Sequence, residues 1–584
     1  MKRYQTSLAS QYFSFILAVS LGLLGQVFSY APLSAEPLAV QEQPNVGRSE
    51  KAMIATVHPL ASEAGVTAFD HGGNAVDAAI AAAFMLGVVD GSNSGIGGGC
   101  FMLIRTPDGK VYCLDARETA PAKATRDMYL RNGKPDTGLS QVGALAIGVP
   151  GALAGYCEAV KRFGRLNLGD LILPAAQVAE SGFEIDAEYA KDLVREGKDF
   201  RKFPGSAAIF LNEQNQPHPA GTKLIQNDLG KTYRAIVTGG ADWFYQGEFA
   251  QATSHWMEEN GGILTATDMA NYRCVWRTPL KTTYHDYTIY GFPPPSSGGV
   301  HVAQILNILE DFDLQKIHDQ SVTQYTHVVS EAMKLAFADR AYWLGDPAFA
   351  NVPLGLLEKS YARDLARRID LNKAQSVTAH GMPPDADGNY FPKHTTHITA
   401  VDREGYWVAI TTTVNTTFGS KVIVPGLGVI MNNQMDDFSI APGTPNAFGL
   451  VGSEANAVEA GKRPLSSMSP TLIEKNGQPL MTVGAAGGPR IITSTLLAIL
   501  RSLDLEMPLD QAISEPRFHH QWSPNKITCE RSFDASVMEQ LRGLGHQVEY
   551  SNDKGISQAI SYDPATKVFT GVADPRTSGK ALGR

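Results

Sequence analysis

Residues 393–414 read KHTTHITAVDREGYWVAITTTV, and this stretch decides the fold. Residues 398–401 and 406–414 are rich in β-branched and aromatic side chains, which is typical of strands. The turn-like spacer at residues 402–405, DREG, lies between them, so we expect a β-hairpin. The preceding residues 374–394 contain Pro, Gly, Asp and Asn without an apolar period, which indicates an exposed, flexible connection.

Thr395 stands where this connection meets the first strand. Cleavage of the His394–Thr395 bond would give Thr395 a free α-amine beside its own hydroxyl, and that amine can accept the hydroxyl proton. A threonine without an adjacent base has no such route at neutral pH. These residues therefore suggest a self-activated threonine nucleophile. The alternative, favoured by this short motif alone, is a solvated loop that leads into an ordinary threonine-rich strand.

The N-terminus has the pattern of a secretory signal peptide. Lys2 and Arg3 precede a mostly apolar stretch, residues 12–31, and residues 33–35 (LSA) offer a cleavage site after Ala35. Polar residues and glycines inside the apolar stretch argue against a permanent membrane anchor. We therefore expect export, to the periplasm in a bacterium, and no membrane association after removal of the signal.

Composition and charge exclude several classes of function. The chain has 584 residues and a formal net charge of −9, with acidic and basic residues interleaved. It lacks the basic face of a nucleic-acid-binding protein and the polybasic patch of a membrane-surface protein, so we expect neither partner. The five cysteines are widely spaced, form no zinc pattern, and are interpreted mostly as small core residues. Only a Cys100–Cys113 disulfide stays open as an alternative.

Helix and strand patterns alternate in blocks along the chain. Residues 60–89 form an alanine-rich helical pattern that Gly72-Gly73 interrupts, and Asn74 or Asp77 can cap the second helix. Such blocks favour layered α+β or α/β sheets over a solenoid or a bundle. Further helices are expected at residues 151–162, 171–181 and 321–342, a strand at 284–290, and hairpins around residues 107–109 and 476–477.

Two glycine-rich segments invite different interpretations. Residues 94–99 (SGIGGG) precede a strand instead of linking a strand to a helix, which favours close backbone packing over phosphate binding. Gly487 and Gly488 precede Pro489 and an apolar helical run, residues 490–503. Their amides are candidate donors to the oxyanion of an acyl-transfer reaction. An ordinary tight turn is the alternative.

Two sets of polar residues have the chemistry to hold an amino acid by its α-groups. The first set offers carboxylate and amide oxygens, which suit an ammonium, and the second offers a guanidinium and two hydroxyls, which suit a carboxylate. Sequence spacing alone does not bring them together, and each residue singly is typical of a surface or capping position. The first set is Asn415, Gln434 and Asp437, and the second is Arg117, Ser466 and Ser467.

His519 and His520 are adjacent, so they point to different sides of a strand or helix. A shared metal ion is therefore not expected there. No metal and no organic cofactor is predicted for this chain.

Several separate motifs together resemble the γ-glutamyltranspeptidase family, a branch of the N-terminal-nucleophile hydrolases. The similarity extends over nearly all of the sequence that follows the signal peptide. One of these motifs could be chance, whereas the full set in this order is specific. The motifs are residues 293–299 (PPPSSGG), 395–397 (TTH), 415–419 (NTTFG), 432–438 (NNQMDDF), 462–470 (KRPLSSMSP), 517–520 (RFHH) and 573–576 (ADPR).

The resemblance implies a four-layer αββα sandwich of the α/β (α+β) class. One chain would cut itself between His394 and Thr395 into a large subunit, residues 36–394, and a small subunit, residues 395–584, which stay together as a heterodimer. The enzyme would cleave the γ-glutamyl amide bond of glutathione and other γ-glutamyl compounds. It would transfer the acyl group to water or to amino acid or dipeptide acceptors.

The resemblance also assigns a role to each candidate residue. It implies that Thr395 is the nucleophile of self-cleavage and turnover, and that it forms a γ-glutamyl ester. The remaining roles follow the two sets above: Thr413 hydrogen-bonds the nucleophile; Arg117, Ser466 and Ser467 hold the α-carboxylate; Asn415, Gln434 and Asp437 hold the α-amine; Gly487 and Gly488 form the oxyanion hole.

Two departures from the family pattern and two alternatives remain. The loop at residues 442–449 carries Phe448 where the family often has a tyrosine, so its gating role as a lid is altered. The glycine pair lies in AAGGP, residues 485–489, instead of the commoner SPGGS. One alternative is a related acylase, of the cephalosporin or poly-γ-glutamate type. The other is a secreted γ-glutamyl-peptide-binding protein that never matures.

Overall fold

The computed structural model describes residues 45–384, 396–441, 444–447, 449–450 and 454–584. The expected signal peptide, the cleavage site at His394 and Thr395, and the lid residue Phe448 lie outside the described residues. Within the described part, no helix has the length and apolar character needed to cross a membrane.

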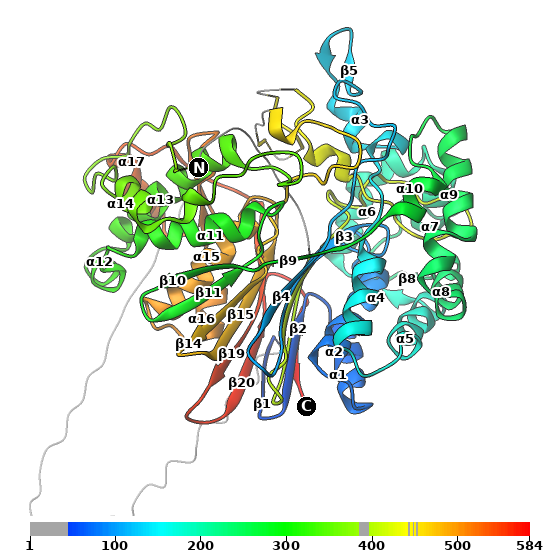
Figure 1. Ribbon diagram of the computed structural model, residues 1–584, viewed down its shortest axis with the longest axis horizontal. Coiled ribbons are helices and arrows are strands. Elements are labelled where there is room, and N and C mark those ends of the chain that lie inside the picture. Colours follow the sequence, from blue (N-terminus) through cyan, green and yellow to red (C-terminus); the bar gives the residue numbers. More distant parts are fainter. Residues whose placement is uncertain (1–44, 385–395, 442–443, 448, 451–453) are drawn as a thin grey trace, which may run out of the picture. The chain divides into compact units, whose positions relative to one another are not determined.

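Two seven-stranded antiparallel sheets form the centre of the molecule (Figure 1). Sheet A has the order β1 (Val46–Ser49), β20 (Val568–Ala573), β19 (Ile556–Asp563), β15 (Gln478–Ala486), β14 (Thr471–Lys475), β11 (Tyr287–Gly291) and β10 (Leu280–Tyr284). Sheet B has the order β21 (Lys580–Gly583), β2 (Ala52–Thr56), β12 (Thr396–Asp402), β13 (Trp407–Thr413), β3 (Gly99–Arg105), β4 (Val111–Ala116) and β9 (Val275–Arg277).

The two sheets pack face to face through an apolar core to which both contribute. Trp407 of β13 and Phe101 of β3 are buried there together with Leu472 of β14 and Ile560 of β19. On the opposite side of β12 and β13, residues such as Ile398 pack against helices instead. This alternation buries both faces of the central hairpin, which is why its sequence is apolar or threonine-rich at nearly every position.

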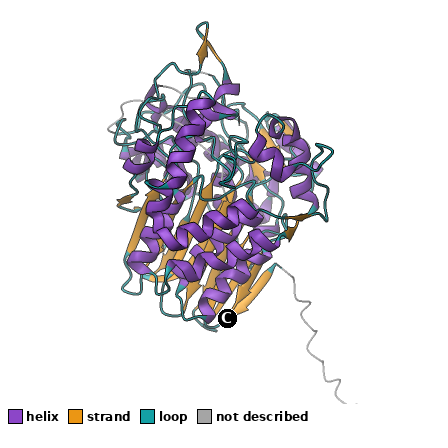
Figure 2. Cartoon of the chain, turned by 90° about the vertical axis from the view of Figure 1, so that its right-hand side faces the viewer, coloured by secondary structure: helices purple, strands orange, loops and turns teal. Residues whose placement is uncertain are grey.

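Helices cover the outer face of each sheet, which gives four layers (Figures 1 and 2). Against sheet B lie α1 (Pro59–Asp70), α2 (Ala75–Val89), α4 (Ala152–Phe163), α5 (Leu168–Ser181) and α8 (Asn227–Tyr245). Against sheet A lie α11 (Ser297–Leu309), α13 (Val322–Trp343) and α15 (Arg490–Leu503). The expected αββα sandwich is confirmed.

Shorter elements connect these layers. The helices are α3 (Thr137–Gln141), α6 (Ala187–Phe200), α7 (Pro204–Phe210), α9 (Glu248–Glu259), α10 (Ala266–Asn271), α12 (Leu314–Gln320), α14 (Lys359–Ala366), α16 (Leu509–Ser514) and α17 (Ala535–Gly543), with 3-10 turns η1 (Ala144–Ala146), η2 (Leu354–Leu357), η3 (Gln434–Asp437) and η4 (Glu454–Asn456). The strands are β5 (Leu130–Arg131), β6 (Lys134–Pro135), β7 (Phe183–Glu184), β8 (Lys223–Leu224), β16 (Phe518–His519), β17 (Ile527–Cys529) and β18 (Val548–Tyr550).

The local signals that define the core elements are confirmed. β12 and β13 form the expected hairpin, and Asn74 caps α2 in a reciprocal capping box with Asp77. The glycines before β3 serve close packing, because a Cβ on Gly98 would lie 1.7 Å from the carbonyl oxygen of Thr413. That contact holds the start of β3 against the end of β13.

One expected strand is shorter than predicted, and the cysteine alternative is decided. The strand expected at residues 284–290 is confirmed from Tyr287 onward as part of β11, but its start is wrong, because the chain turns at residues 285–286 in the β10–β11 hairpin. His285, at the turn, has a φ of 49°, which a continuous strand cannot contain. Cys100 and Cys113 are free thiols in the core, opposite Ala116 and Leu103 in the β3–β4 ladder.

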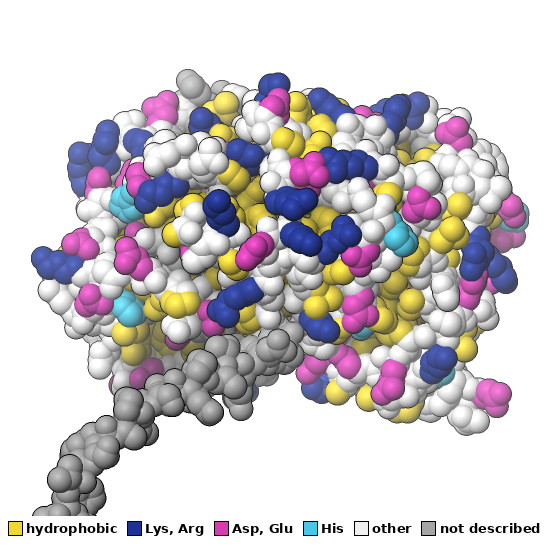
Figure 3. All heavy atoms as spheres, turned by 90° about the horizontal axis from the view of Figure 1, so that it is seen from below, with side chains coloured by type: hydrophobic (Ala, Val, Ile, Leu, Met, Phe, Trp, Pro, Cys, Tyr) yellow, Lys and Arg dark blue, Asp and Glu magenta, His cyan; other side chains and the backbone are white. Residues whose placement is uncertain are grey.

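The face of the molecule seen from below carries charges of both signs (Figure 3). Lysine and arginine side chains lie among aspartate and glutamate side chains, with hydrophobic side chains between them. On this face the mixed charge of the sequence is therefore distributed, not gathered into a patch of one sign.

Candidate active site

The candidate residues of sheet B lie at one end of its strands. Neighbouring antiparallel strands begin and end there in turn. β12 begins at Thr396, directly after Thr395 in the sequence, and Thr396 pairs with Thr412. The last residue of β13, Thr413, pairs with Gly99 at the start of β3. Arg117 directly follows β4, the next strand in the sheet. The oxygen of the buried Thr413 hydroxyl accepts a 2.8 Å hydrogen bond from the N–H of Asn415.

Arg117 joins three segments that are far apart in the sequence. Its Nη2 is hydrogen-bonded and ion-paired to Oδ2 of Asp437, and Nε2 of Gln434 donates to the same oxygen at 2.7 Å. The guanidinium also donates to the carbonyl oxygens of Pro464 and Leu465, each at 3.1 Å. The structure therefore brings the arginine, the η3 turn and the segment before the two serines together.

We call Arg117, Asn415, Gln434, Asp437, Ser466 and Ser467 the α-group pocket, a name that refers to the role predicted for these side chains and not to an observed cavity. All six side chains are buried. Nδ2 of Asn415 donates to the carbonyl oxygen of Asn433 at 3.0 Å, which places it beside the η3 turn. The structure thus gathers both polar sets that the sequence left unconnected.

Several atoms of this pocket are buried without a hydrogen-bond partner among the described residues. Nη1 of Arg117 has no hydrogen-bond acceptor, although it lies 3.6 Å from Oε2 of Glu118, and Oδ1 of Asn415 and Oε1 of Gln434 have no donor. The hydroxyl oxygens of Ser466 and Ser467 each accept a hydrogen bond, and within the described chain neither hydroxyl donates one. Because buried polar atoms are almost always paired, this set points to a ligand that supplies both acceptors and donors.

Gly487 and Gly488 lie between β15 and α15, and both have positive φ, 118° and 64°. A Cβ on Gly487 would lie 2.5 Å from the carbonyl oxygen of Lys554, so glycine is required there. Within the described residues, neither glycine amide donates a hydrogen bond. A cavity of about 250 Å³ is lined by Gly487 together with Thr396, which puts Gly487 next to the start of β12.

Asp90 also lies at this cavity and was not singled out from the sequence. Its Oδ2 accepts a 2.8 Å hydrogen bond from the hydroxyl of Thr396, the residue after Thr395. Burial raises the pKa of Asp90 to about 7. Asp90 follows α2 in an apolar run, and a lone acidic residue at a helix end gives no sequence signal for such a contact.

Two buried charges next to the α-group pocket were also missed. Glu118 follows Arg117, and burial raises the pKa of its carboxyl group to about 8. Arg340 of α13 donates from Nη2 to the Ser467 hydroxyl at 2.8 Å and from Nε to the Ser297 hydroxyl at 3.0 Å. Arg340 lies 127 positions before Ser467, so no spacing rule could connect them.

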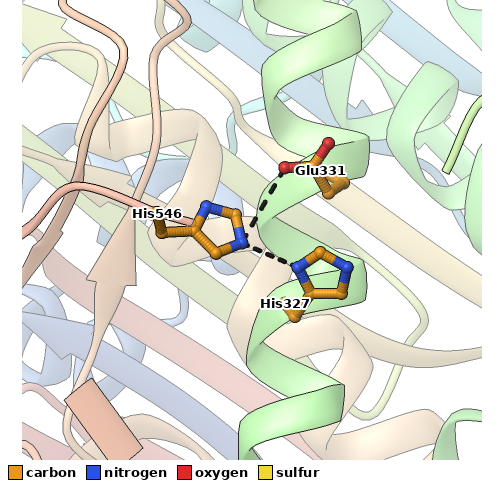
Figure 4. A group of neighbouring side chains, drawn as sticks. All are labelled: His327, Glu331 and His546. Atoms are coloured by element: carbon orange, nitrogen blue, oxygen red, sulfur yellow. Dashed lines mark hydrogen bonds and ion pairs between the residues drawn. The ribbon is translucent and has the colours of Figure 1, made fainter. Parts of the chain in front are cut away.

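A second buried polar cluster lies on α13 (Figure 4). We call His327, Glu331, Lys334 and His546 the α13 tether. Nε2 of His546 lies 2.7 Å from Nδ1 of His327 and 3.8 Å from Oε1 of Glu331. Nζ of Lys334 donates to the same carboxylate at 2.5 Å and to the carbonyl oxygen of Gln375 at 2.8 Å.

The contacts of this cluster join α13 to the backbone at Asp370 and Gln375 and do not fit a metal centre. Two nitrogens bound to one zinc ion would lie about 3.3 Å apart, whereas 2.7 Å is a direct hydrogen bond between the rings. The ammonium of Lys334 already neutralises Glu331. Nε2 of His327 and Oε2 of Glu331 bond to the backbone at Asp370 and Gln375, in the described part of the connection before Thr395.

His519 and His520 have separate partners, in agreement with the expectation that they face different sides. His519 bonds to Thr493 and Gln521 through its two ring nitrogens. His520 bonds to Asn525 and to the N–H of Trp522. No atom is shared between the two sets.

The four-layer sandwich and the site at the ends of its central strands define the class of N-terminal-nucleophile hydrolases. The chain belongs to the γ-glutamyltranspeptidase family, whose model matches residues 61–584. The glutathione hydrolase proenzyme of Escherichia coli strain K12 is 40% identical over 568 residues, 96% of this chain and 97% of that relative.

Solved structures agree with this assignment. A cephalosporin acylase from Bacillus halodurans superposes with a TM-score of 0.83 at 27% identity and covers 94% of this chain and 99% of its own. A γ-glutamyltranspeptidase from Helicobacter pylori superposes with a TM-score of 0.53 at 40% identity, over 55% of this chain and 91% of its own.

Proposed function

We propose that this enzyme cleaves the γ-glutamyl amide bond of glutathione and related γ-glutamyl compounds. The acyl group passes through an ester on Thr395 to water, or to an amino acid or dipeptide. Membership of the family supports this activity, and the α-group pocket supports the substrate class.

The observation that carries the proposal is the set of unpartnered atoms in the α-group pocket. Nη1 of Arg117 and the hydroxyls of Ser466 and Ser467 are donors, which match an α-carboxylate. Oδ1 of Asn415 and Oε1 of Gln434 are acceptors, which match an α-ammonium. A free α-amino acid group supplies both charges side by side.

The Arg117–Asp437 ion pair gives this match an electrostatic basis. Without substrate, the buried guanidinium and carboxylate neutralise each other. A bound zwitterion places its carboxylate on Arg117 and its ammonium on Asp437, so one internal ion pair is exchanged for two. A ligand with only one of these charges would leave a buried protein charge without its partner, which typically costs about 2–5 kcal/mol.

The reaction needs no group beyond the chain and its substrates. The Thr395 amine accepts the hydroxyl proton while Oγ1 attacks the γ-carbonyl carbon, and the amides of Gly487 and Gly488 donate to the oxyanion. The C–N bond breaks, the proton leaves with the amine, and a γ-glutamyl ester remains. Water or an acceptor amine then attacks the ester, and Thr395 recovers its hydroxyl. Thr413, whose oxygen already accepts from Asn415, serves to orient the nucleophile.

The same hydroxyl accounts for maturation. Its attack on the His394 carbonyl carbon moves the acyl group from nitrogen to oxygen, and hydrolysis of that ester frees the Thr395 amine. Strands from residues 36–394 pair with strands from residues 395–584 in both sheets: β2 and β3 flank the β12–β13 hairpin, and β11 pairs with β14. The two products of cleavage would therefore stay interlocked as a heterodimer. The N-terminal pattern supports export, to the periplasm in a bacterium, with cleavage after Ala35.

The two described residues that precede Phe448 in the sequence contact the η3 turn. The N–H of Ala447 donates to Oδ2 of Asp436 at 3.2 Å, and Nδ2 of Asn446 donates to the carbonyl oxygen of Asp436 at 3.3 Å. Asp436 precedes Asp437 in the η3 turn. These contacts support a lid role for Phe448.

The alternative function is that of an acylase. The high structural similarity to the cephalosporin acylase is the reason to test it. The test compares three anilides on the purified enzyme: γ-glutamyl, glutaryl (no α-amine) and γ-glutamyl α-carboxamide (no α-carboxylate). We expect cleavage of the first and a loss of about 30-fold or more in kcat/KM for each of the others. Equal turnover of glutaryl and γ-glutamyl anilides would establish the acylase instead.

A denaturing gel tests maturation in the same preparation. We expect two bands, the smaller beginning at Thr395, and a single inactive band for Thr395→Ala. Cleavage of Thr395→Ala at the same bond would exclude self-processing. A single uncut band for the parent protein would favour the non-maturing binding protein.

A further inference from the structure

Arg340 lies behind the α-group pocket in an unusual setting for a charged residue. Its side chain is fully buried on α13, and its guanidinium donates hydrogen bonds to two serine hydroxyls. Nη2 donates to Ser467 and Nε donates to Ser297. The Ser297 hydroxyl in turn donates to the carbonyl oxygen of Ser466 at 2.7 Å. One guanidinium thus contacts Ser467 directly and Ser466 through the hydroxyl of Ser297.

The guanidinium determines where the Ser467 proton can point. A hydroxyl has one proton and two lone pairs, so an oxygen that accepts from Arg340 keeps its O–H for another partner. Within the described residues that O–H has no acceptor, and Arg117 approaches the same segment through the carbonyl oxygen of Leu465. The free direction is therefore toward the pocket, where an α-carboxylate would lie.

Arg340 also adds charge. Burial lowers its pKa to about 9, which leaves it protonated at neutral pH. The negative charge of Asp437 acts on Arg340 over a distance and partly offsets this burial. A second buried cation therefore stands behind the serines, on the side of the pocket that would receive an anion.

We propose that Arg340 is a positioning residue that orients the Ser467 hydroxyl and so sets the preference of the pocket for an α-carboxylate. This proposal rests on the proposed function, because it names a determinant of the same substrate pocket. Arg340 does not touch the substrate itself and acts through Ser467 and Ser297. A planar fork is needed for this role, because a lysine ammonium cannot hold both hydroxyls in one fixed plane.

The experiment is a double-mutant cycle with Arg340→Lys, Ser467→Ala and the combined variant. Each is assayed with γ-glutamyl anilide and with its α-carboxamide. Either single change should raise KM for the carboxylate substrate about 10-fold, with kcat changed by less than about 3-fold. The double variant should be no worse than Ser467→Ala alone, because both changes remove one interaction. Independent, multiplying effects on KM would overturn the proposal.

Arg501→Lys is the matched control. Arg501 is another buried arginine, and it donates to the backbone carbonyl oxygens of Ala512, Glu515 and Pro516. This variant should lower the thermal midpoint without changing the ratio of KM values for the two anilides. If Arg501→Lys changes that ratio as much as Arg340→Lys does, the effect is general to buried arginines and the proposal falls.

Ser297→Ala keeps the proposal testable if Arg340→Lys does not fold or mature. The variant removes only the hydroxyl that accepts from Nε of Arg340. We expect about a 3-fold rise in KM for the carboxylate substrate and none for the carboxamide. An equal change for both substrates would overturn the role of Arg340. A parent enzyme that fails to distinguish the two anilides would instead contradict the proposed function.

Discussion

The α-group pocket and the α13 tether are both buried, and both combine a cation, a carboxylate and neutral polar side chains. In the tether, each ring nitrogen of His327 and each carboxylate oxygen of Glu331 has a partner, and no atom of the cluster is buried without one among the described residues. In the pocket, atoms of Arg117, Asn415 and Gln434 are buried and have none. Residue types alone do not distinguish the two regions.

The difference shows how buried polar clusters can be sorted into structural and functional ones. A cluster that satisfies itself stabilises the fold, and removal of one member leaves a buried charge or an unpaired group. In a cluster whose donors and acceptors lack partners, the free energy of desolvation is not compensated. A ligand that supplies the missing hydrogen bonds compensates it. The tether should therefore govern stability, and the pocket should govern substrate recognition.

The largest expected effect is that of Asp437→Asn on substrate use. Loss of the carboxylate removes the partner of the substrate ammonium, so kcat/KM for γ-glutamyl anilide should fall by about 30- to 4000-fold. Glutaryl anilide, which lacks the ammonium, should lose far less. Steady-state kinetics with both substrates measures this. A proportional loss for both would mean that Asp437 does not distinguish the amine.

Glu331→Gln should lower stability and leave substrate binding unchanged. The variant leaves the Lys334 ammonium buried without its carboxylate, and such a loss typically costs about 3–5 kcal/mol of stability. We expect a lower thermal midpoint and an unchanged KM for γ-glutamyl anilide. Glu404→Gln, which breaks the exposed pair with Arg165, is the matched control and should change stability by less than about 1 kcal/mol. A normal midpoint together with a raised KM would reverse the assignment of the two regions.

The sequence predicted the fold well where the determining contacts are local. The capping box of α2, the β12–β13 hairpin and the close approach of Gly98 to β13 all depend on neighbouring residues or on a strong backbone requirement. The start of the strand expected at residues 284–290 was wrong for a local reason as well, whereas residues 287–290 lie in β11. A two-residue turn at His285 divides a run that is β-prone on both sides.

The site was predictable through motifs and not through spacing. Arg117 and Asp437 are separated by 320 positions. Their contact depends on the order of the strands in sheet B and on the η3 turn. Arg340 and Glu118 gave no signal, because an arginine in a long helix and a glutamate beside an arginine are ordinary in sequence. Their functional interest arises from burial, which only the packed structure determines.

Glu118 gives the α-group pocket a pH dependence. Its carboxyl pKa is raised to about 8 by burial, so it is protonated at neutral pH and ionises above pH 8. Ionisation would add a negative charge beside Arg117 and oppose binding of an α-carboxylate. We expect KM for γ-glutamyl anilide to rise about 3-fold between pH 7 and pH 8.5, and Glu118→Gln to reduce this rise.

The same shift predicts the effect of pH on stability. Between the ordinary pKa of 4.5 and the raised value of about 8, the unfolded chain loses the Glu118 proton and the native chain keeps it. The contribution of Glu118 to stability is therefore full below pH 4.5 and is lost as pH rises toward 8. The thermal midpoint of Glu118→Gln relative to the parent should increase over this range. A difference that is independent of pH would show that Glu118 is ionised in the native protein.

The smallest expected effect is that of substitutions at Phe448, the proposed lid residue. The residues before it in the sequence, Asn446 and Ala447, donate hydrogen bonds to Asp436, which precedes Asp437 of the α-group pocket. A phenyl ring can exclude water from the acyl-enzyme by packing, but it cannot donate the hydrogen bond of a tyrosine. Phe448→Tyr should therefore shift the ratio of hydrolysis to transfer by about 2- to 5-fold without affecting self-cleavage. Phe448→Ala should raise the hydrolytic share or admit bulkier acyl groups. The measurement uses γ-glutamyl anilide with and without a dipeptide acceptor, and an unchanged ratio in both variants would show that recognition in this pocket proceeds without a lid at Phe448.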